Sequence, residues 1–378
     1  MKRHYYWLDL LRFLAAFQVL AFHYRGAFFV EYRLLPATQQ NLLTSILFFF
    51  TRLGEQSVLI FFVLSGFLVG GKSLERIIHN KVDIKSYIID RFVRIMLPLT
   101  ASVVLVILID LFIGHQIPWI HLLGSLFSLQ GIFTNWYTNG PLWSLSYEVW
   151  FYVLMGCIMV IFRAQNKRFF VFSILILTLV ILIFTTKLSP IFLLIWLLGA
   201  STYLLPPPLK SSSKKKILIL GCLVLSGMVL TVIAYPSRSV TLRFSLLNRN
   251  MANIFLAFTT CIFIHNIIRC VPQNKLAIKI DKIGSKLSKF SYSLYLTHFP
   301  LISLFRFLGF PQSPSINFKS VSLYLFEIFI ALVTGYIFFL VFEKHTIKVK
   351  RFLKNRKRKR PIISGKYEYY ERFTNESS

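Results

Sequence analysis

The stretch LDLLRFLAAFQVLAFH, residues 8–23, reads as one membrane-spanning helix except for three ionisable side chains. Asp9 and Arg12 lie near its start, and His23 lies at its end. A charged side chain costs at least ~2.5–3.5 kcal/mol near the centre of a bilayer. We therefore expect other segments of the chain to surround these groups, and we expect the groups to have a function.

Apolar residues make up 56% of the 378 residues, and the mean hydropathy is +0.64. A soluble domain has no way to bury so much apolar surface, so we expect an all-α polytopic integral membrane protein. About ten runs are apolar and long enough to span a bilayer. They cover residues 7–27, 55–71, 96–114, 143–162, 169–186, 188–205, 217–235, 251–268, 290–308 and 322–343.

Lysine and arginine are distributed unequally between the segments that join these runs. With the N-terminus inside, the cytoplasmic segments carry 33 of these residues and the outer segments carry 9. Positive residues accumulate on the cytoplasmic side of membrane proteins, so we predict that both termini are cytoplasmic. Residues 1–343 then form one transmembrane domain, and residues 344–378 form a basic cytoplasmic tail that is partly disordered.

The formal charge of +29 follows from this topology and from attraction to the anionic lipids of the inner leaflet. We therefore expect membrane lipids, and not nucleic acid, as the partner of the basic segments. The four cysteines lie in or beside apolar runs without paired spacing or a metal-ligand pattern. No metal is predicted.

Helical geometry places the three ionisable residues of the first run on one side. Arg12 and His23 are 11 residues apart, which returns the helix to within roughly 20° and separates them by roughly 16 Å along the axis. Asp9 lies three residues before Arg12, so an ion pair between them is expected. Imidazole titrates near neutrality, and His23 is therefore the candidate functional group of this stripe.

The run at 143–162 carries a second candidate, Glu148. This residue lies about 7 residues, or roughly 10 Å, below the outer surface, at a depth similar to that of His23. A carboxylate beside an imidazole forms a general-base pair, so we predict that Glu148 orients His23. A structural salt link is the alternative.

Three polar residues precede the third run. Ser65, in VLSGF, is interpreted as a packing residue, because a nucleophile elbow needs a glycine two residues before the serine. Arg91 and Arg94 share a helix face, which suits either binding of donor phosphates or simple anchoring by positive charge.

The run at 290–308 places Tyr292, Tyr295 and His298 on one stripe, where they line a cavity or bond across helices. The outer segment 115–142 has no charged residue. With Trp143 it forms either an aromatic belt or a lid that stacks on a sugar.

Five motifs occur in this order: LDLLRFLAAFQVLAFH, FFVLSGFLV, DRFVRIMLP, PLWSLSYEVWFY and FSYSLYLTHFP. Over about residues 7–343 the chain resembles the membrane acyltransferase-3 family, whose members O-acylate bacterial surface carbohydrates. The arginine and histidine of the family's first motif fall on Arg12 and His23. Its glutamate falls on Glu148, and its basic pair falls on Arg91 and Arg94.

The chain also departs from that family at three positions. Leu10 and Phe13 stand where the family often has glycines, and Val149 stands where it often has a second acid. These changes leave the assignment of His23 intact but bear on helix packing and on the acceptor. Some relatives carry an extracytoplasmic esterase-like domain, and none is recognised here, so a separate extracytoplasmic transferase is a candidate partner.

The resemblance implies an O-acetyltransferase of the cell inner membrane that takes acetyl-CoA, or another acyl-CoA, as co-substrate without a bound cofactor. Its acceptor is a glycan or glycolipid such as lipopolysaccharide or another surface polysaccharide. Arg91 and Arg94 are expected to hold the donor phosphates, Arg12 the acyl group, and His23 the proton of the acceptor hydroxyl. Asp9, Ser65, Tyr292, Tyr295, His298 and Trp143 are the expected cavity-lining residues.

One alternative belongs to another class of function. In a transporter or flippase of a lipid-linked sugar, His23 and Glu148 form a proton relay across the membrane. The order of the motifs favours acyl transfer.

Overall fold

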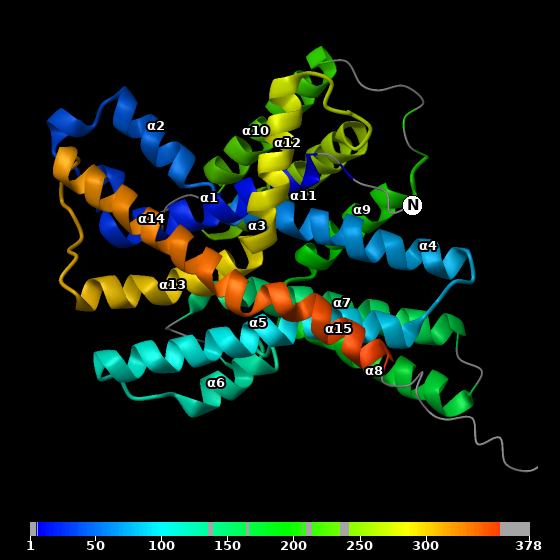
Figure 1. Cartoon of the computed structure of the whole chain (residues 1–378). Helices are drawn as coiled ribbons and strands as arrows, with labels where there is room; N and C mark the ends of the chain where they lie inside the picture. The colour runs from blue at the N-terminus through cyan, green and yellow to red at the C-terminus, as the bar shows by residue number, and fades with distance from the viewer. Residues whose placement is uncertain are drawn as a thin grey trace, which may run out of the picture.

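A computed structural model describes residues 5, 7–134, 139–163, 166–206, 208, 214–234 and 242–355, with the backbone alone at 242–248. In these ranges every regular element is a helix (Figure 1). The α-helices are α1 (Leu8–Phe28), α2 (Leu42–Thr51), α3 (Gly54–Ser65), α4 (Lys72–Ile78), α5 (Ile84–Ile113), α6 (Trp119–Leu126), α7 (Trp143–Arg163), α8 (Lys167–Thr186), α9 (Pro190–Leu204), α10 (Lys214–Ala234), α11 (Leu242–Ile267), α12 (Lys275–Leu287), α13 (Ser291–Phe307), α14 (Phe318–Val341) and α15 (Thr346–Asn355).

Seven helical segments in the described ranges are long and apolar enough to cross a membrane. They correspond to seven of the ten runs expected from the sequence, and none of these seven runs extends past its segment by more than one residue at an end. The other three runs correspond to α1, α9 and α13. Of these, α9 has 15 residues and α13 has 17, so at 1.5 Å per residue both fall short of a bilayer core about 30 Å thick. An all-helical, multi-pass fold is confirmed, while the number ten stays a prediction.

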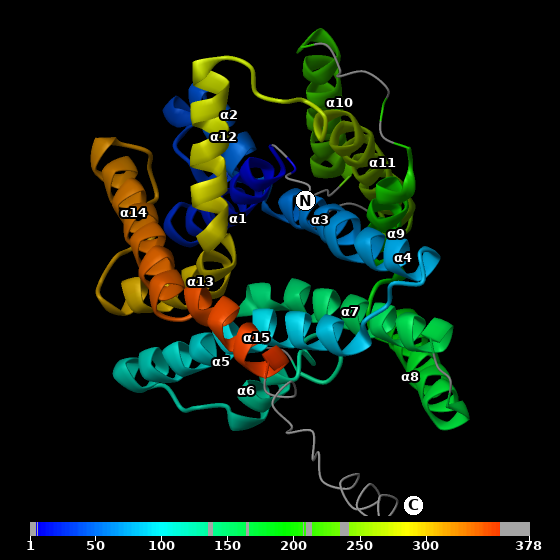
Figure 2. The same cartoon turned by 45° about the vertical axis from the view of Figure 1, so that its right-hand side comes forward.

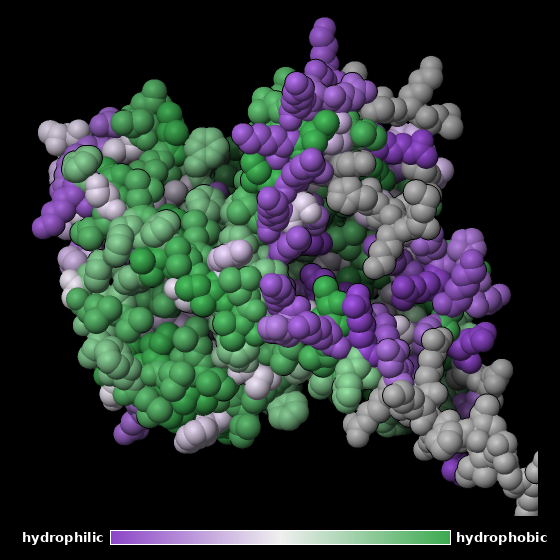
Figure 3. All heavy atoms as spheres, in the orientation of Figure 1, coloured by the Kyte–Doolittle hydropathy of each residue, from purple (hydrophilic) through white to green (hydrophobic). Residues whose placement is uncertain are grey.

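Helix α1 lies inside the bundle. It packs against α3, α12, α13 and α14, and the two views place it between these helices (Figures 1 and 2). Asp9 and Arg12 therefore lie inside the bundle, where they line a cavity. The surface has two different sides in Figure 3. Hydrophilic residues gather on the right-hand side, over α4, α12 and α15, and the left-hand side is largely apolar.

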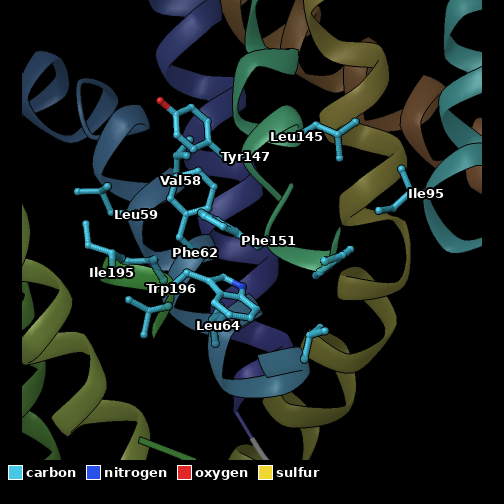
Figure 4. Packing of buried hydrophobic residues seen from close by; sticks show 14 of the residues in the cluster. Val58, Leu59, Phe62, Leu64, Ile95, Leu145, Tyr147, Phe151, Ile195 and Trp196 are labelled. Carbon is cyan, nitrogen blue, oxygen red and sulfur yellow. The ribbon is translucent and has the colours of Figure 1, made fainter. Parts of the chain in front are cut away.

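A hydrophobic core with several aromatic rings joins α3, α7 and α9 (Figure 4), and Phe184 of α8 also belongs to it. The ring of Phe151 stacks on Phe184 at 5.5 Å and on Trp196 at 5.3 Å between centroids. The backbones of α3 and α9 also approach closely: a side chain at Gly199 of α9 would collide with the carbonyl of Val63 in α3. Such close approach by small residues is typical of helix packing in membranes. The inner end of α3 is thereby fixed, and it carries Ser65.

Helix α5 brings the two predicted basic residues into the bundle. It begins at a cap in which the Asp83 carboxylate accepts from the backbone N–H of Ser86 at 2.9 Å, and it ends before Gly114, whose φ is 83°. Glycine adopts this left-handed conformation without steric cost. Arg91 and Arg94 lie three residues apart near the start of the helix and share its inner face.

Candidate functional site

A polar cavity of about 340 Å³ opens between α1, α3, α5 and α7. Its lining includes the first two turns of α1, the third turn of α5, the end of α3, the start of α4 and the middle of α7. Cations outnumber carboxylates in this lining. The charged residues are Arg12, Lys72, Arg91, Arg94, Asp9 and Glu148. The predicted Asp9–Arg12 ion pair is confirmed, with 3.2 Å between Arg12 Nη1 and Asp9 Oδ1.

A second, smaller cavity of about 100 Å³ adjoins the first. Arg12, Arg94 and Glu148 line both of them, so these residues mark the junction. Beyond the junction the lining changes to hydroxyl groups and apolar side chains, among them Tyr292 and Tyr295. A cationic mouth therefore leads into an inner chamber without further charge.

Glu148 is held at this junction by hydroxyl groups. The hydroxyl of Tyr152 donates a short hydrogen bond to Glu148 Oε1, and Ser65 Oγ lies 3.4 Å from the same oxygen. Trp196 Nε1 lies 3.3 Å from Ser65 Oγ, so the serine is tied to α9 as well. Arg12 also interacts electrostatically with Glu148. Ser65 acts here as a hydrogen-bonding link between helices.

The predicted contact between His23 and Glu148 is wrong. No hydrogen bond or ion pair joins them in the described part of the chain. The ring of His23 instead faces His298 at 5.4 Å and the edge of Phe299 at 5.2 Å between centroids. Equal depth on two helices does not fix the rotation of either, and α7 turns Glu148 toward Arg12.

His298 is fixed in one orientation behind the inner chamber. Its Nδ1 lies 2.9 Å from the carbonyl of Tyr295 and 3.2 Å from that of Leu294. Backbone carbonyls only accept, so Nδ1 carries the proton and Nε2 presents a lone pair. Nε2 is buried without a hydrogen-bond partner among the described residues. In this tautomer, Nε2 of His298 is the basic nitrogen, and its ring lies next to that of His23.

Pro300 lies inside the continuous helix α13, and the backbone carbonyl that it leaves free is bonded by other segments. Pro300 lacks an N–H and leaves the carbonyl of Leu296 free. Ser102 Oγ on α5 donates to this carbonyl at 3.0 Å, and Asn139 Nδ2 donates at 3.2 Å. The proline therefore connects α13 to α5 and to the segment before η4 (Gly140–Leu142).

A family model described as an acyltransferase domain, Acyl_transf_3, matches residues 5–343. The chain belongs to this family. Neither a curated protein nor a solved structure matches the chain. The protein is thus a multi-pass membrane acyltransferase, and the resemblance noted from its motifs is confirmed.

The mouth of this acyltransferase is arranged to hold an anion. The guanidinium of Arg91 lies over the ring of Tyr152 with 5.5 Å to the centroid, and Lys72 Nζ lies 5.4 Å from the centroid of Tyr5. Aromatic faces fix cations without neutralising them. Planar guanidinium groups suit phosphate oxygens in particular. The residues described include no group of three or more His, Cys, Asp or Glu suited to a metal ion.

The acyltransferase also contains site residues that the sequence interpretation missed or misplaced. Tyr152 follows Glu148 by one helical turn, and this i,i+4 spacing was a signal for their contact. Lys72 had no comparable signal. Trp143 was expected in the cavity, but its ring packs against Phe62 and Phe192 at 6.4 and 5.8 Å between centroids. Its neighbour Ser144 lines the inner chamber instead.

Proposed function

We propose that this acyltransferase transfers an acyl group, in the first place acetyl, from acyl-CoA to a hydroxyl of a cell-surface or lipid-linked carbohydrate. One observation carries the proposal: a cationic mouth leads past Arg12 into a chamber that adds no further charged residue and whose lining includes Tyr295, which adjoins His298. A donor with phosphates at one end and a thioester at the other matches this order. Acyl-CoA is then a co-substrate, and the proposal includes no bound cofactor.

Donor binding is assigned to the basic pair on α5. Arg91 and Arg94 line the mouth, and their guanidinium groups form charge-assisted hydrogen bonds with phosphate oxygens. Arg12, held by Asp9, lies where the thioester passes into the inner chamber. Its positive charge stabilises the oxygen of the thioester carbonyl as negative charge develops there.

Proton transfer is assigned to His23. Its ring removes the proton from the acceptor hydroxyl while the hydroxyl oxygen attacks the thioester carbon. The carbon–sulfur bond then breaks, the electron pair leaves with the coenzyme A thiolate, and His23 returns its proton to that sulfur. In the alternative through an acyl-histidine, the ring of His23 attacks the thioester carbon, and the coenzyme A thiolate leaves and takes the ring proton. The acceptor oxygen then displaces the imidazole, which takes the hydroxyl proton. The aromatic rings around His23 exclude the water that would hydrolyse the thioester.

Glu148 receives a positioning role in place of the one expected from the sequence. It binds Tyr152 and Ser65 and lies near Arg12, so it holds the junction between the two cavities in shape. Removal of Glu148 is expected to alter donor binding through Arg12, whereas removal of His23 leaves the mouth unchanged.

The membrane and the partners belong to the same proposal. We place the protein in the cell inner membrane, with the mouth toward cytoplasmic acyl-CoA and with anionic lipids beside the basic helices. The acceptor is a glycan or glycolipid such as lipopolysaccharide or another surface polysaccharide. It is acylated either directly or through a separate extracytoplasmic transferase.

The test uses purified full-length protein with radiolabelled acetyl-CoA and a crude membrane glycan extract. Wild type is expected to consume acetyl-CoA and label the glycan, and the His23→Ala variant is expected to do neither. His79→Ala provides a matched control, because this histidine is exposed and lies outside both cavities. If the wild-type protein neither binds nor consumes acetyl-CoA, but transports a lipid-linked sugar under a pH gradient, the transporter alternative is established.

A further inference from the structure

Helix α15 lies beyond the part of the chain that the family model matches, which ends at residue 343. It follows α14 through the short helix η6 (Glu343–His345) and packs against α5 (Figures 1 and 2). The start of α5 carries Arg91 and Arg94. The basic tail thus begins with a helix that lies beside the proposed donor-binding cations.

Contacts at both ends hold α15 in this position. Near its end, Lys354 Nζ lies 2.9 Å from Asp90 Oδ2 and 2.6 Å from Ser86 Oγ, both on α5. Before its start, Glu343 accepts hydrogen bonds from the backbone N–H of Ser293 at 3.2 Å and from its hydroxyl at 2.6 Å. The helix is therefore attached to two neighbours, and its register against α5 is set.

This register places Lys350 on the side of α15 that faces α5, near Arg91 and Arg94 but outside the lining of the mouth. Lys350 lies one turn before Lys354, so both side chains project from the same face of α15. It is partly buried and interacts electrostatically with Arg94, Arg91, Asp90 and Lys354. Asp90 is already paired with Lys354. In the described part of the chain, no carboxylate forms an ion pair with Arg91, Arg94 or Lys350.

Asp90 and Glu343 are the carboxylates near this group, but neither forms an ion pair with its three cations. The cations therefore repel one another, and a bound anion removes that repulsion. Arg91 and Arg94 line the cavity, whereas Lys350 approaches them from outside its lining. An anion at Lys350 is therefore further from the inner chamber than an anion at the arginines. If a donor enters with its thioester first, the phosphate nearer the thioester meets the arginines, and the phosphate farther from it meets Lys350.

We propose that Lys350 binds the 3′-phosphate of the acyl-CoA donor, while Arg91 and Arg94 bind its pyrophosphate. The inference rests on the proposed function, because it assigns one more group of the same donor. In coenzyme A the pyrophosphate follows the thioester arm, and the 3′-phosphate lies on the ribose beyond it. Lys350 thus gives the mouth a contact that distinguishes coenzyme A from the same molecule without its 3′-phosphate.

The experiment measures binding by calorimetry with full-length protein in detergent at low salt, without an acceptor. Acetyl-CoA and acetyl-3′-dephospho-CoA are compared for wild type, Lys350→Gln and Lys348→Gln. Lys348 is an exposed lysine about 200° away on the same helix, so it matches the charge change without facing α5. We expect wild type and Lys348→Gln to prefer acetyl-CoA by about five- to tenfold, and Lys350→Gln to show no preference.

Each other outcome overturns a definite statement. If Lys350→Gln keeps the preference of wild type, Lys350 does not bind the 3′-phosphate, while the proposed function stands. If Lys350→Gln weakens both ligands equally, the lysine acts on the pyrophosphate, and the assignment is wrong. If wild type binds neither ligand, the proposed function itself fails, and this inference fails with it.

Discussion

The two ends of the polar stripe on α1 lie in opposite environments. Arg12 pairs with Asp9 and faces two cavities among several other charges, whereas His23 lies among the rings of Phe22, His298 and Phe299. The first end suits recognition of a charged group, since it offers fixed cations and an opening. The second suits proton transfer, since it offers basic nitrogens and few charges. In the proposed function, one helix thus separates donor binding from proton transfer by about three turns.

The strongest test of this division removes the imidazole at one end. His23→Ala is expected to lower kcat by about 100- to 10,000-fold, the range of a general base. The affinity for acetyl-CoA is expected to stay within about twofold of wild type, because the mouth is about 16 Å away along the helix. Single-turnover kinetics and equilibrium binding measure the two effects. A parallel loss of donor binding would show that the two ends are not separate.

The complementary test weakens the mouth. The double variant Arg91→Gln, Arg94→Gln is expected to raise the KM for acetyl-CoA by about 10- to 100-fold, because each arginine supplies charge-assisted hydrogen bonds. At saturating acetyl-CoA, kcat should remain close to that of wild type. Initial rates against donor concentration separate the two parameters. A fall in kcat alone would place these arginines in the chemical step.

A third change tests whether His298 acts through its neighbour. His298→Asn keeps a donor for the carbonyl of Tyr295 but removes the basic Nε2. Turnover is expected to fall by about 10- to 100-fold, less than for His23→Ala, because His298 adjoins the proposed base without being that base. Rates measured for the two variants side by side decide the order. Equal losses would assign both histidines to the reaction.

The smallest effect is expected at Ser65. Ser65→Ala removes only contacts of 3.3–3.4 Å to Glu148, Tyr152 and Trp196, so activity should change by less than about threefold. The same assay of acetyl-CoA consumption measures it, with Ser201→Ala as a control on an exposed position of α9. A loss of a hundredfold or more would revive the nucleophilic serine that the sequence does not favour.

Much of the fold and part of the site were predictable from local patterns. Apolar runs located the helices, and the spacing of three residues located the Asp9–Arg12 pair. Arg91 and Arg94 share a helix face, and the structure places both in one cavity. Each of these relations lies within one helix, where 3.6 residues per turn determine which side chains are neighbours.

The relations between helices were not predictable in the same way. The depth of Glu148 in the membrane was estimated from its position in the run. Depth along the helix axis does not determine the direction in which the side chain points around that axis. The partner of His23 is therefore His298 and not Glu148. Lys72 and Trp143 illustrate the same limit, since their places depend on how α4 and α7 pack against neighbours. The position of Lys350 depends on the docking of α15, which no local pattern encodes.

The carbonyl of Leu296, left free by Pro300, has a consequence for the reach of the enzyme. This one oxygen receives hydrogen bonds from Ser102, which lies about two turns after Arg94, and from Asn139. These bonds join the helix with the arginines to the helix with His298. For the proposed function, the spacing between the mouth and the histidines is then set by the protein, and the flexible arm of an acyl-CoA donor has to span it.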